Sequence, residues 1–159
     1  MQKPVKRIGE ILVAKGFINE AQLASGLLEQ KINNVFLGEI LIKRGWLTER
    51  RLQEALSEQF GIPLVNIKDQ RLDLELARAF ASSLVVDQKC FPLSKDESSI
   101  TIAIVNPLNA QAMSEAEEAA KPLEVNFVLV PEEDFQELLK KYRMQISQDI
   151  LKVLKKDKQ

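Results

Sequence analysis

The sequence contains no histidine and only one cysteine among its 159 residues. Without histidine the chain cannot build a Ser-His-Asp or Cys-His catalytic group, and most kinds of zinc site are excluded as well. The single Cys90 cannot form an internal disulfide, which fits a reducing compartment such as the cytoplasm. Its place at the start of a predicted strand favours a small buried residue over a reactive thiol.

Other features are missing too. No apolar run approaches the roughly 18 residues of a membrane-spanning helix, and the N-terminal segment lacks the apolar core of a secretory signal. The chain has no glycine-rich loop ending in Gly-Lys-Ser/Thr, and no Gly-x-Gly-x-x-Gly follows a predicted strand. The sequence therefore predicts a protein that is not an enzyme, with no cofactor and no metal site.

The charge is small in total but uneven along the chain. Residues 1–60 carry nine basic and seven acidic residues, residues 61–143 carry nine and fourteen, and residues 144–159 carry four and two. The mildly basic first segment suits a small anion. It is far less basic than a domain that binds duplex DNA mainly through phosphates.

The most informative feature that is present is a tandem repeat. Residues 7–30 and 36–59 align at a shift of 29, with ten of 24 positions identical. A period of this length indicates repeated supersecondary units. Two copies of one surface suit a ligand with two similar halves.

Each copy reads as two short helices. Apolar residues at helical spacing open each copy, and Gly16 and Gly45 follow where a glycine commonly ends a helix. Asn19 and Thr48 are candidate N-caps for the second helix of each copy. Gly61 and the proline that follows it are expected to end the last helix.

The pattern changes after the repeats. A strand, a polar turn and a second strand are expected over residues 90–105, a helix over 110–120, a third strand over 123–130 and a helix over 131–144. Residues 72–86 also favour a helix. The sequence thus predicts an α+β fold with a helical subdomain over residues 1–62, an α/β subdomain of about three strands over 63–143, and a basic amphipathic tail or linker over 144–159.

The start of each copy is the candidate ligand site. A glycine in the first turn of a helix, as at Gly9 and Gly38, lets a ligand or another backbone approach closely, and the helix start attracts anions. Arg7 can fork onto a phosphate or a guanine edge. The leucines at helical spacing in the second helix of each copy can form an apolar surface against the face of a base, and Gln30 and Gln59 can hydrogen-bond a base edge.

Each of these features has a second interpretation. Leucines at helical spacing are core residues in most helices, and this applies to Leu23, Leu27, Leu52 and Leu56. Glycines at a helix start also permit tight helix packing, and Arg7 alone can be a solvated surface charge. The ligand interpretation gains support because the glycine, the apolar row and the terminal glutamine all return at one period.

At these residues the chain resembles the MshEN-type N-terminal domain of type II secretion and type IV pilus assembly ATPases (the GspE, PilB and MshE group). The matching pattern is a basic residue followed by an apolar residue and glycine, then paired apolar positions, a second glycine, two leucines and a glutamine, written twice. It runs from Arg7 to Gln30 and from Leu37 to Gln59. The resemblance extends through the α/β part to about Tyr142.

The resemblance implies that the chain binds cyclic di-GMP, with each copy holding one half of the dinucleotide. It places Arg7 on a guanine, the leucines against bases and ribose, and the backbone at Gly9 and Gly38 near the phosphates. The expected ligand-binding residues are Arg7, Ile8, Gly9, Glu10, Leu23, Leu27, Gln30, Phe36, Leu37, Gly38, Glu39, Leu52, Leu56, Gln59 and Asn106.

Two positions depart from the family pattern. Phe36 stands where the second copy often carries Arg or Lys, so one basic contact is missing; the ring either stacks on the ligand or is buried. Asn106 stands where the family often carries Asp, and it offers Arg7 only a neutral hydrogen bond. These departures leave weaker binding, or none, as open outcomes.

The sequence therefore carries two main hypotheses. The first is a cyclic di-GMP-binding regulatory module of a secretion or pilus ATPase, whose ATPase domain belongs to the same or another chain. The second is a docking domain that joins the motor to the cytoplasmic part of an inner-membrane platform protein without nucleotide. Either would place the chain in the cytoplasm, peripheral to the inner membrane through its partners. DNA binding through residues 48–59 is disfavoured because Glu49, Glu54 and Glu58 oppose phosphate contact.

Overall fold

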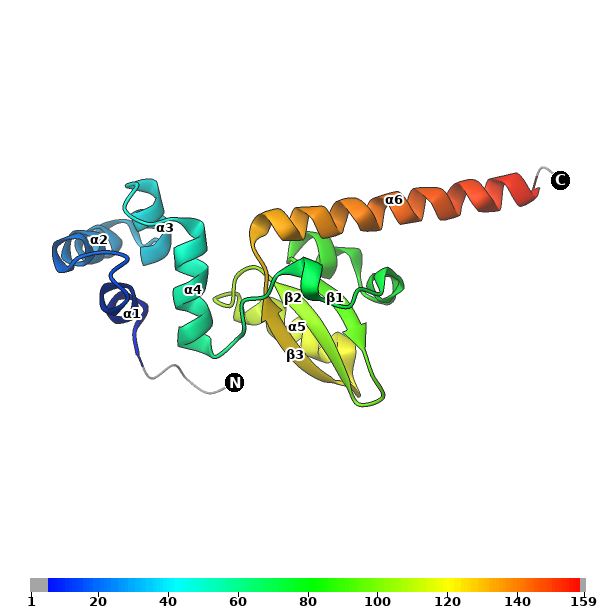
Figure 1. The fold of residues 1–159 in the computed structure, drawn as a ribbon, viewed down its shortest axis with the longest axis horizontal. Coiled ribbons are helices and arrows are strands. Elements are labelled where there is room, and N and C mark those ends of the chain that lie inside the picture. The colour runs from blue at the N-terminus through cyan, green and yellow to red at the C-terminus, as the bar shows by residue number, and fades with distance from the viewer. Residues whose placement is uncertain (1–5, 158–159) are drawn as a thin grey trace. The chain divides into compact units, whose positions relative to one another are not determined.

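The computed structural model describes residues 6–157 and divides the chain into two compact units, Met1–Leu64 and Val65–Gln159 (Figure 1). Unit 1 is helical within its described residues, and unit 2 contains a three-stranded sheet with helices packed on it. The fold is therefore α+β, as the sequence predicts. The division falls two residues after the expected boundary at residue 62.

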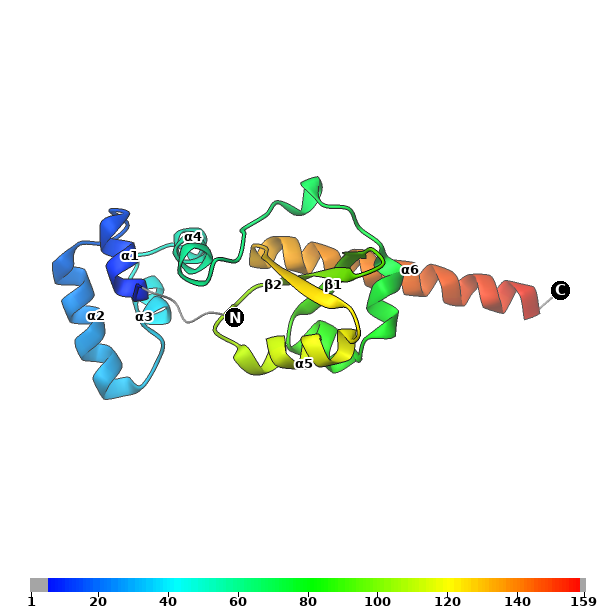
Figure 2. The same cartoon turned by 90° about the horizontal axis from the view of Figure 1, so that it is seen from below.

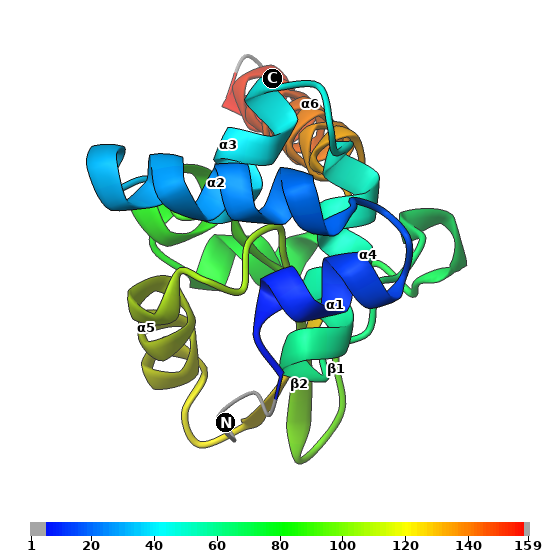
Figure 3. The same ribbon diagram turned by 90° about the vertical axis from the view of Figure 1, so that its left-hand side faces the viewer.

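Unit 1 consists of two helical hairpins. α1 (Ile8–Ala14) and α2 (Glu20–Asn33) form the first hairpin, and α3 (Leu37–Lys43) and α4 (Glu49–Phe60) form the second (Figure 3). α1 and α3 begin 29 residues apart, as do α2 and α4. The period of the sequence repeat is thus also the period of the structure.

The predicted helix ends are confirmed. α1 and α3 are each followed by a glycine in the left-handed region, Gly16 at φ +74° and Gly45 at φ +76°. Asn19 forms a capping box with Gln22. The Asn19 Oδ1 accepts from the Gln22 backbone N–H at 2.8 Å, and the Gln22 Oε1 accepts from the Asn19 backbone N–H at 2.9 Å. Thr48 accepts from the Arg51 backbone N–H at the start of α4.

The two hairpins share one hydrophobic core. Leu12 and Leu41, which are equivalent positions of the two copies, are both fully buried. The core also contains residues from the turn between the helices of each hairpin, Ile18 and Leu47. Because neither hairpin is large enough to bury these side chains alone, the copies stabilise each other.

Unit 2 is built on a mixed sheet in the order β1-β2-β3. β1 (Cys90–Lys95) and β2 (Ser99–Ile104) form an antiparallel hairpin, and β3 (Glu124–Leu129) pairs in parallel with β2. The parallel pairing requires a crossover, which α5 (Ala110–Ala120) provides. Asp96 closes the hairpin by accepting from the backbone N–H groups of Ser98 and Ser99.

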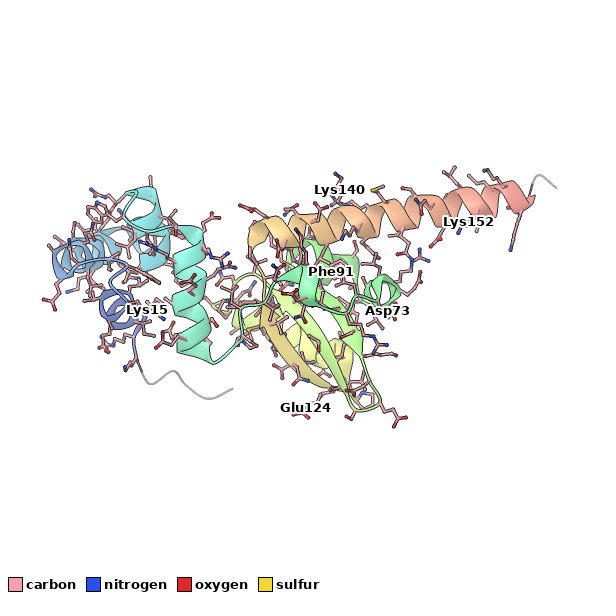
Figure 4. The ribbon with its side chains drawn as sticks, in the orientation of Figure 1. Lys15, Asp73, Phe91, Glu124, Lys140 and Lys152 are labelled. Carbon is pink, nitrogen blue, oxygen red and sulfur yellow. The ribbon has the colours of Figure 1, made fainter. Side chains whose placement is uncertain are left out.

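α5 and α6 (Glu132–Asp157) cover opposite faces of the sheet (Figure 2). On the α6 side, Phe91 makes edge-to-face contacts with Phe135 at 6.3 Å and with Tyr142 at 5.8 Å between ring centroids. Figure 4 labels Phe91 beneath α6. On the α5 side, Cys90 Sγ lies 3.7 Å from the Ala112 carbonyl oxygen.

α6 is longer than the sequence predicts. A helix ending near residue 144 and a separate tail over 144–159 are expected, but α6 continues without a break to Asp157. It begins at Glu132, so Pro131 precedes the helix instead of opening it. The side chain of Gln145 hydrogen-bonds Glu75, and Asp149 forms an ion pair with Arg78. α6 therefore contacts the rest of unit 2 beyond residue 144.

The predicted helix over residues 72–86 is wrong. This segment forms a short 3₁₀ helix, Leu74–Ala79, and a single π-helical turn, Ser83–Asp87. Asp73 caps the first piece, and its backbone N–H donates to the Leu93 carbonyl on β1 at 2.7 Å. The segment is therefore held against the sheet edge, and this tertiary contact prevails over local helix propensity. A further 3₁₀ turn, Ile67–Asp69, lies between α4 and this segment.

Candidate functional site

Two ion pairs join the hairpins of unit 1, and they connect equivalent positions of the two copies. Lys15 of the first copy lies 2.9 Å from Glu58 of the second, measured from Nζ to Oε2. Arg44 of the second copy lies 2.8 Å from Glu29 of the first, measured from Nη2 to Oε2, and its Nε donates to the same carboxylate. Lys15 and Arg44 are equivalent positions of the repeat, and so are Glu29 and Glu58. Figure 4 labels Lys15 between α1 and α4.

This reciprocity determines how the copies are related. Two units stacked by a translation would use one surface of the first copy and a different surface of the second. Contacts in which position i meets j and j meets i arise only when the two units are related by a two-fold rotation. The helix packing agrees, because α1 packs on α4 and α2 packs on α3, and each contact is the two-fold image of the other. Unit 1 is therefore a pseudo-two-fold pair of hairpins.

The glycines in the first turns of α1 and α3 are buried beneath leucines. A Cβ placed on Gly9 would lie 2.6 Å from Leu23 Cδ1, and one on Gly38 would lie 2.7 Å from Leu52 Cδ2. The absent side chains thus let the two helices of each hairpin pack closely. Of the two interpretations made from the sequence, tight helix packing is the one that these contacts match.

The leucine rows are not equivalent in exposure. Leu27 is 43% exposed, whereas its counterpart Leu56 is 4% exposed. Leu23 and Leu52 are half-buried over the glycines. An apolar floor for a ligand, as expected from the sequence, would therefore differ between the copies, with Leu27 as its most accessible member.

The positions before α1 and α3 carry Arg7 and Phe36. Both residues have extended backbone (φ −74°, ψ 149° and φ −61°, ψ 138°), and neither caps its helix with its side chain. Both are exposed, and Phe36 is 55% exposed, so the alternative that Phe36 is a buried core residue is wrong. Glu10 and Glu39, one turn further on, are exposed too, whereas Ile8 and Leu37 pack into the core of unit 1.

The glutamines that end the two rows lie at the ends of the motif. The Gln59 side-chain nitrogen donates to the Lys6 carbonyl at 3.5 Å, which brings the end of α4 beside the chain that leads into Arg7. Within residues 6–157, the Gln59 side-chain oxygen is buried without a hydrogen-bond partner. Gln30 is half-buried at the equivalent position of α2.

Asn106 belongs to unit 2. It follows β2, and its Oδ1 accepts from the Leu108 backbone N–H at 2.9 Å, which closes a turn before α5. The side chain therefore stabilises a local turn. Its exposure leaves the amide accessible.

The structure also reveals a surface that the sequence reasoning missed. Exposed apolar side chains follow one side of α2 into the connector before α3, and we call them the α2 apolar row: Leu28, Ile32, Val35 and Phe36. The first two correspond to Ser57 and Gly61 in the second copy. A comparison of the two copies position by position would have shown this difference.

No metal or membrane feature appears in the part of the chain that the structure describes. Over residues 6–157, no group of three potential ligands from His, Cys, Asp and Glu is placed to hold a metal ion. Within the same range, none of the helices combines the length and the apolar character needed to span a membrane.

Comparisons with known proteins identify the architecture. The family model of the MshEN domain matches residues 60–149. The match begins at the last residue of α4, after the tandem motif, and covers unit 2 up to residue 149. The solved structure of MshE with cdg is 24% identical, covers 87% of this chain and 98% of its own, and superimposes with a TM-score of 0.75. A structure of the N-terminal domain of XpsE is 17% identical, and the match covers 88% of this chain and 96% of the XpsE chain with a TM-score of 0.61. No curated protein sequence matches the chain.

Proposed function

The chain belongs to the MshEN domain family, and on that premise we propose that it is a cyclic di-GMP-binding regulatory module of a type II secretion or type IV pilus assembly ATPase. In this proposal it has no catalytic role of its own. The ATPase domain belongs to the same or another chain, and the module acts in the cytoplasm beside the inner membrane. MshE, whose solved structure contains cdg, shares this fold.

The observation that carries the proposal is the reciprocal pairing of Lys15 with Glu58 and Arg44 with Glu29. It makes unit 1 a pseudo-two-fold body, and cyclic di-GMP is a two-fold molecule. A ligand seated on the axis would meet the same elements from each copy. Arg7 supplies the cation of one half, with a planar guanidinium suited to a guanine edge or a phosphate.

The packing of the glycines changes the expected mode of contact. Leu23 packs against Gly9 and Leu52 packs against Gly38, so the side-chain face of each glycine is covered by a leucine. We therefore assign the base contacts to the exposed side chains that flank them, chiefly Arg7 and Leu27. Gln59, whose side-chain oxygen has no hydrogen-bond partner among residues 6–157, is a candidate acceptor for a base amino group.

Isothermal titration of the full chain with cyclic di-GMP tests the proposal. Arg7→Ala should weaken binding by about 1–3 kcal/mol, the cost of a lost charged hydrogen-bond partner, which is about a 5- to 150-fold rise in Kd. Lys31→Ala is the matched control, because it removes an exposed cation of α2 outside the motif. Absence of heat, together with an unchanged melting temperature at high ligand concentration, would remove the proposal.

The α2 apolar row favours a second candidate function. Contiguous exposed apolar side chains on a folded unit mark protein interaction sites, and Ile32 is 76% exposed. In this alternative the module docks on the cytoplasmic part of an inner-membrane platform protein. A pull-down with that partner should lose signal in Ile32→Glu, and repeating it with and without the dinucleotide separates docking alone from docking that the nucleotide controls.

A further inference from the structure

The pseudo-two-fold unit carries different chemistry at one pair of equivalent positions. Arg7 and Phe36 precede α1 and α3 with the same extended backbone, and both side chains are exposed. Phe36 is therefore a large aromatic residue that the core of unit 1 does not use. Its ring is accessible on the second copy where the first copy presents a guanidinium.

The two-fold relation places these side chains at matching points of the unit. Positions related by a two-fold axis lie at equal distances from it and at equal heights along it. A cyclic dinucleotide seated on that axis presents one base to each copy. If the site of the proposed function is used, Arg7 meets one base and Phe36 meets the other.

The two side chains recognise bases differently. A guanidinium donates two hydrogen bonds to O6 and N7 of guanine, whereas adenine offers an amino donor in place of O6. An aromatic ring stacks on the face of any base and does not read its edge. The first copy therefore selects guanine, and the second copy requires only a flat purine.

We propose that this chain is a receptor for hybrid cyclic purine dinucleotides as well as for cyclic di-GMP. It binds cyclic GMP–AMP about as tightly as cyclic di-GMP and discriminates against cyclic di-AMP. Phe36 is the residue that relaxes the specificity of the second half. The inference rests on the proposed function, because it concerns the same site.

Titration of the full chain with the three dinucleotides provides the test. The Kd for cyclic GMP–AMP should lie within about threefold of that for cyclic di-GMP, since the hybrid has one productive orientation where the symmetric ligand has two. Cyclic di-AMP should bind at least about tenfold more weakly, because it gives Arg7 no guanine in either orientation.

Variants identify the residue responsible. Phe36→Arg places a guanidinium on the second copy. In that variant the affinity for cyclic GMP–AMP should be at least about tenfold lower than the affinity for cyclic di-GMP. Val35→Arg is the matched control, because it adds the same charge at the adjacent exposed position and should leave the ratio of the two affinities unchanged. Arg7→Ala should reduce the discrimination against cyclic di-AMP.

The outcomes separate this inference from the proposed function. If cyclic di-GMP binds and the hybrid is more than about tenfold weaker, the inference is overturned and the proposed function stands. Equal binding of all three ligands would overturn it too, because Arg7 would then not read guanine. An equal change of the affinity ratio in Phe36→Arg and Val35→Arg would have the same consequence, since charge alone would be responsible. If none of the three binds, both proposals fail.

Discussion

A methyl group added at Gly38 tests whether close helix packing is the role of the repeated glycines. In Gly38→Ala the new Cβ would lie 2.7 Å from Leu52 Cδ2 and 2.8 Å from Cδ1. Ordinary contact begins at 3.4 Å, so the two terminal carbons of the leucine are about 0.7 Å and about 0.6 Å too close. Moving both carbons away requires a rotation about the Cα–Cβ bond of Leu52, which changes the packing of this side chain against the core of unit 1.

Two opposing effects determine the magnitude. Overpacking by one methylene in a packed site costs about 1–3 kcal/mol. Replacing glycine by alanine in a helix returns up to about 1 kcal/mol. The overpacking term is larger, so Gly38→Ala should lower the free energy of unfolding by about 1–2 kcal/mol. Gly9→Ala should cost less, because only Leu23 Cδ1 is closer than 3.4 Å to the new atom.

A double-mutant cycle makes the reasoning refutable. Leu52→Ala removes both carbons that the new methyl group meets, so in that background Gly38→Ala should become stabilising by up to about 1 kcal/mol. Urea unfolding can be followed by the fluorescence of Trp46, the single tryptophan, which packs against the core of unit 1. An equal destabilisation in both backgrounds would refute the packing argument and return Gly38 to the list of candidate ligand contacts.

Three further predictions concern other parts of the chain. Burial, with the charge of Glu115 adding to it, raises the pKa of the Cys90 thiol from 9.0 to about 11, so the thiol of the unfolded chain ionises first. The free energy of unfolding should therefore fall as the pH rises from 9.0 to about 11, and it should fall less in Cys90→Ala. Asn19→Ala removes the capping box and should cost about 1 kcal/mol in urea unfolding, whereas Asn19→Gly should cost only a few tenths. Reversing one charge of the Lys15–Glu58 pair should lower the free energy of unfolding by up to about 1 kcal/mol at low salt. Reversing both charges should recover the lost stability, and a failure to recover it would show that the pair does not hold the hairpins together.

Much of unit 1 follows from the repeat. Gly16 and Gly45 end α1 and α3, and Asn19 and Thr48 cap α2 and α4, because these residue types meet local backbone requirements that need no tertiary contact. The three strands and α5 of unit 2 were predictable for a similar reason, since alternation and turn residues are local signals. The cap and turn chemistry thus sets most element boundaries.

Tertiary contacts determine the features that local sequence patterns do not predict. Residues 72–86 have helical periodicity, yet the Asp73 backbone bonds to Leu93 on β1, and only short helical pieces form. A glycine in a first turn is compatible with ligand approach and with tight helix packing, and the structure shows that Leu23 and Leu52 pack against Gly9 and Gly38. Sequence shows that a side chain is absent and does not show what fills the space.

The surroundings of the candidate site residues follow from the sequence only in part. The repeat identified Arg7, Phe36 and the glutamines as positions of interest, but it could not show that Phe36 is exposed or that Leu56 is buried. The two-fold relation was encoded in the repeat through Lys15 and Arg44 with Glu29 and Glu58. It became visible only when the structure showed which copy each charge contacts.

The differences between the two copies have a physical pattern. Interior residues are kept in kind in both copies. Leu12 and Leu41 lie in the core that the two hairpins share, and Gly9 and Gly38 each lie beneath a leucine of their own hairpin. Several positions that are exposed in the first copy have changed in kind, as Arg7 to Phe36 and Leu28 to Ser57. A duplicated unit can specialise at its surface without losing its symmetric interior. The same interior can therefore support a binding face whose two halves differ, and the asymmetry of Arg7 and Phe36 is where that difference should be measured first.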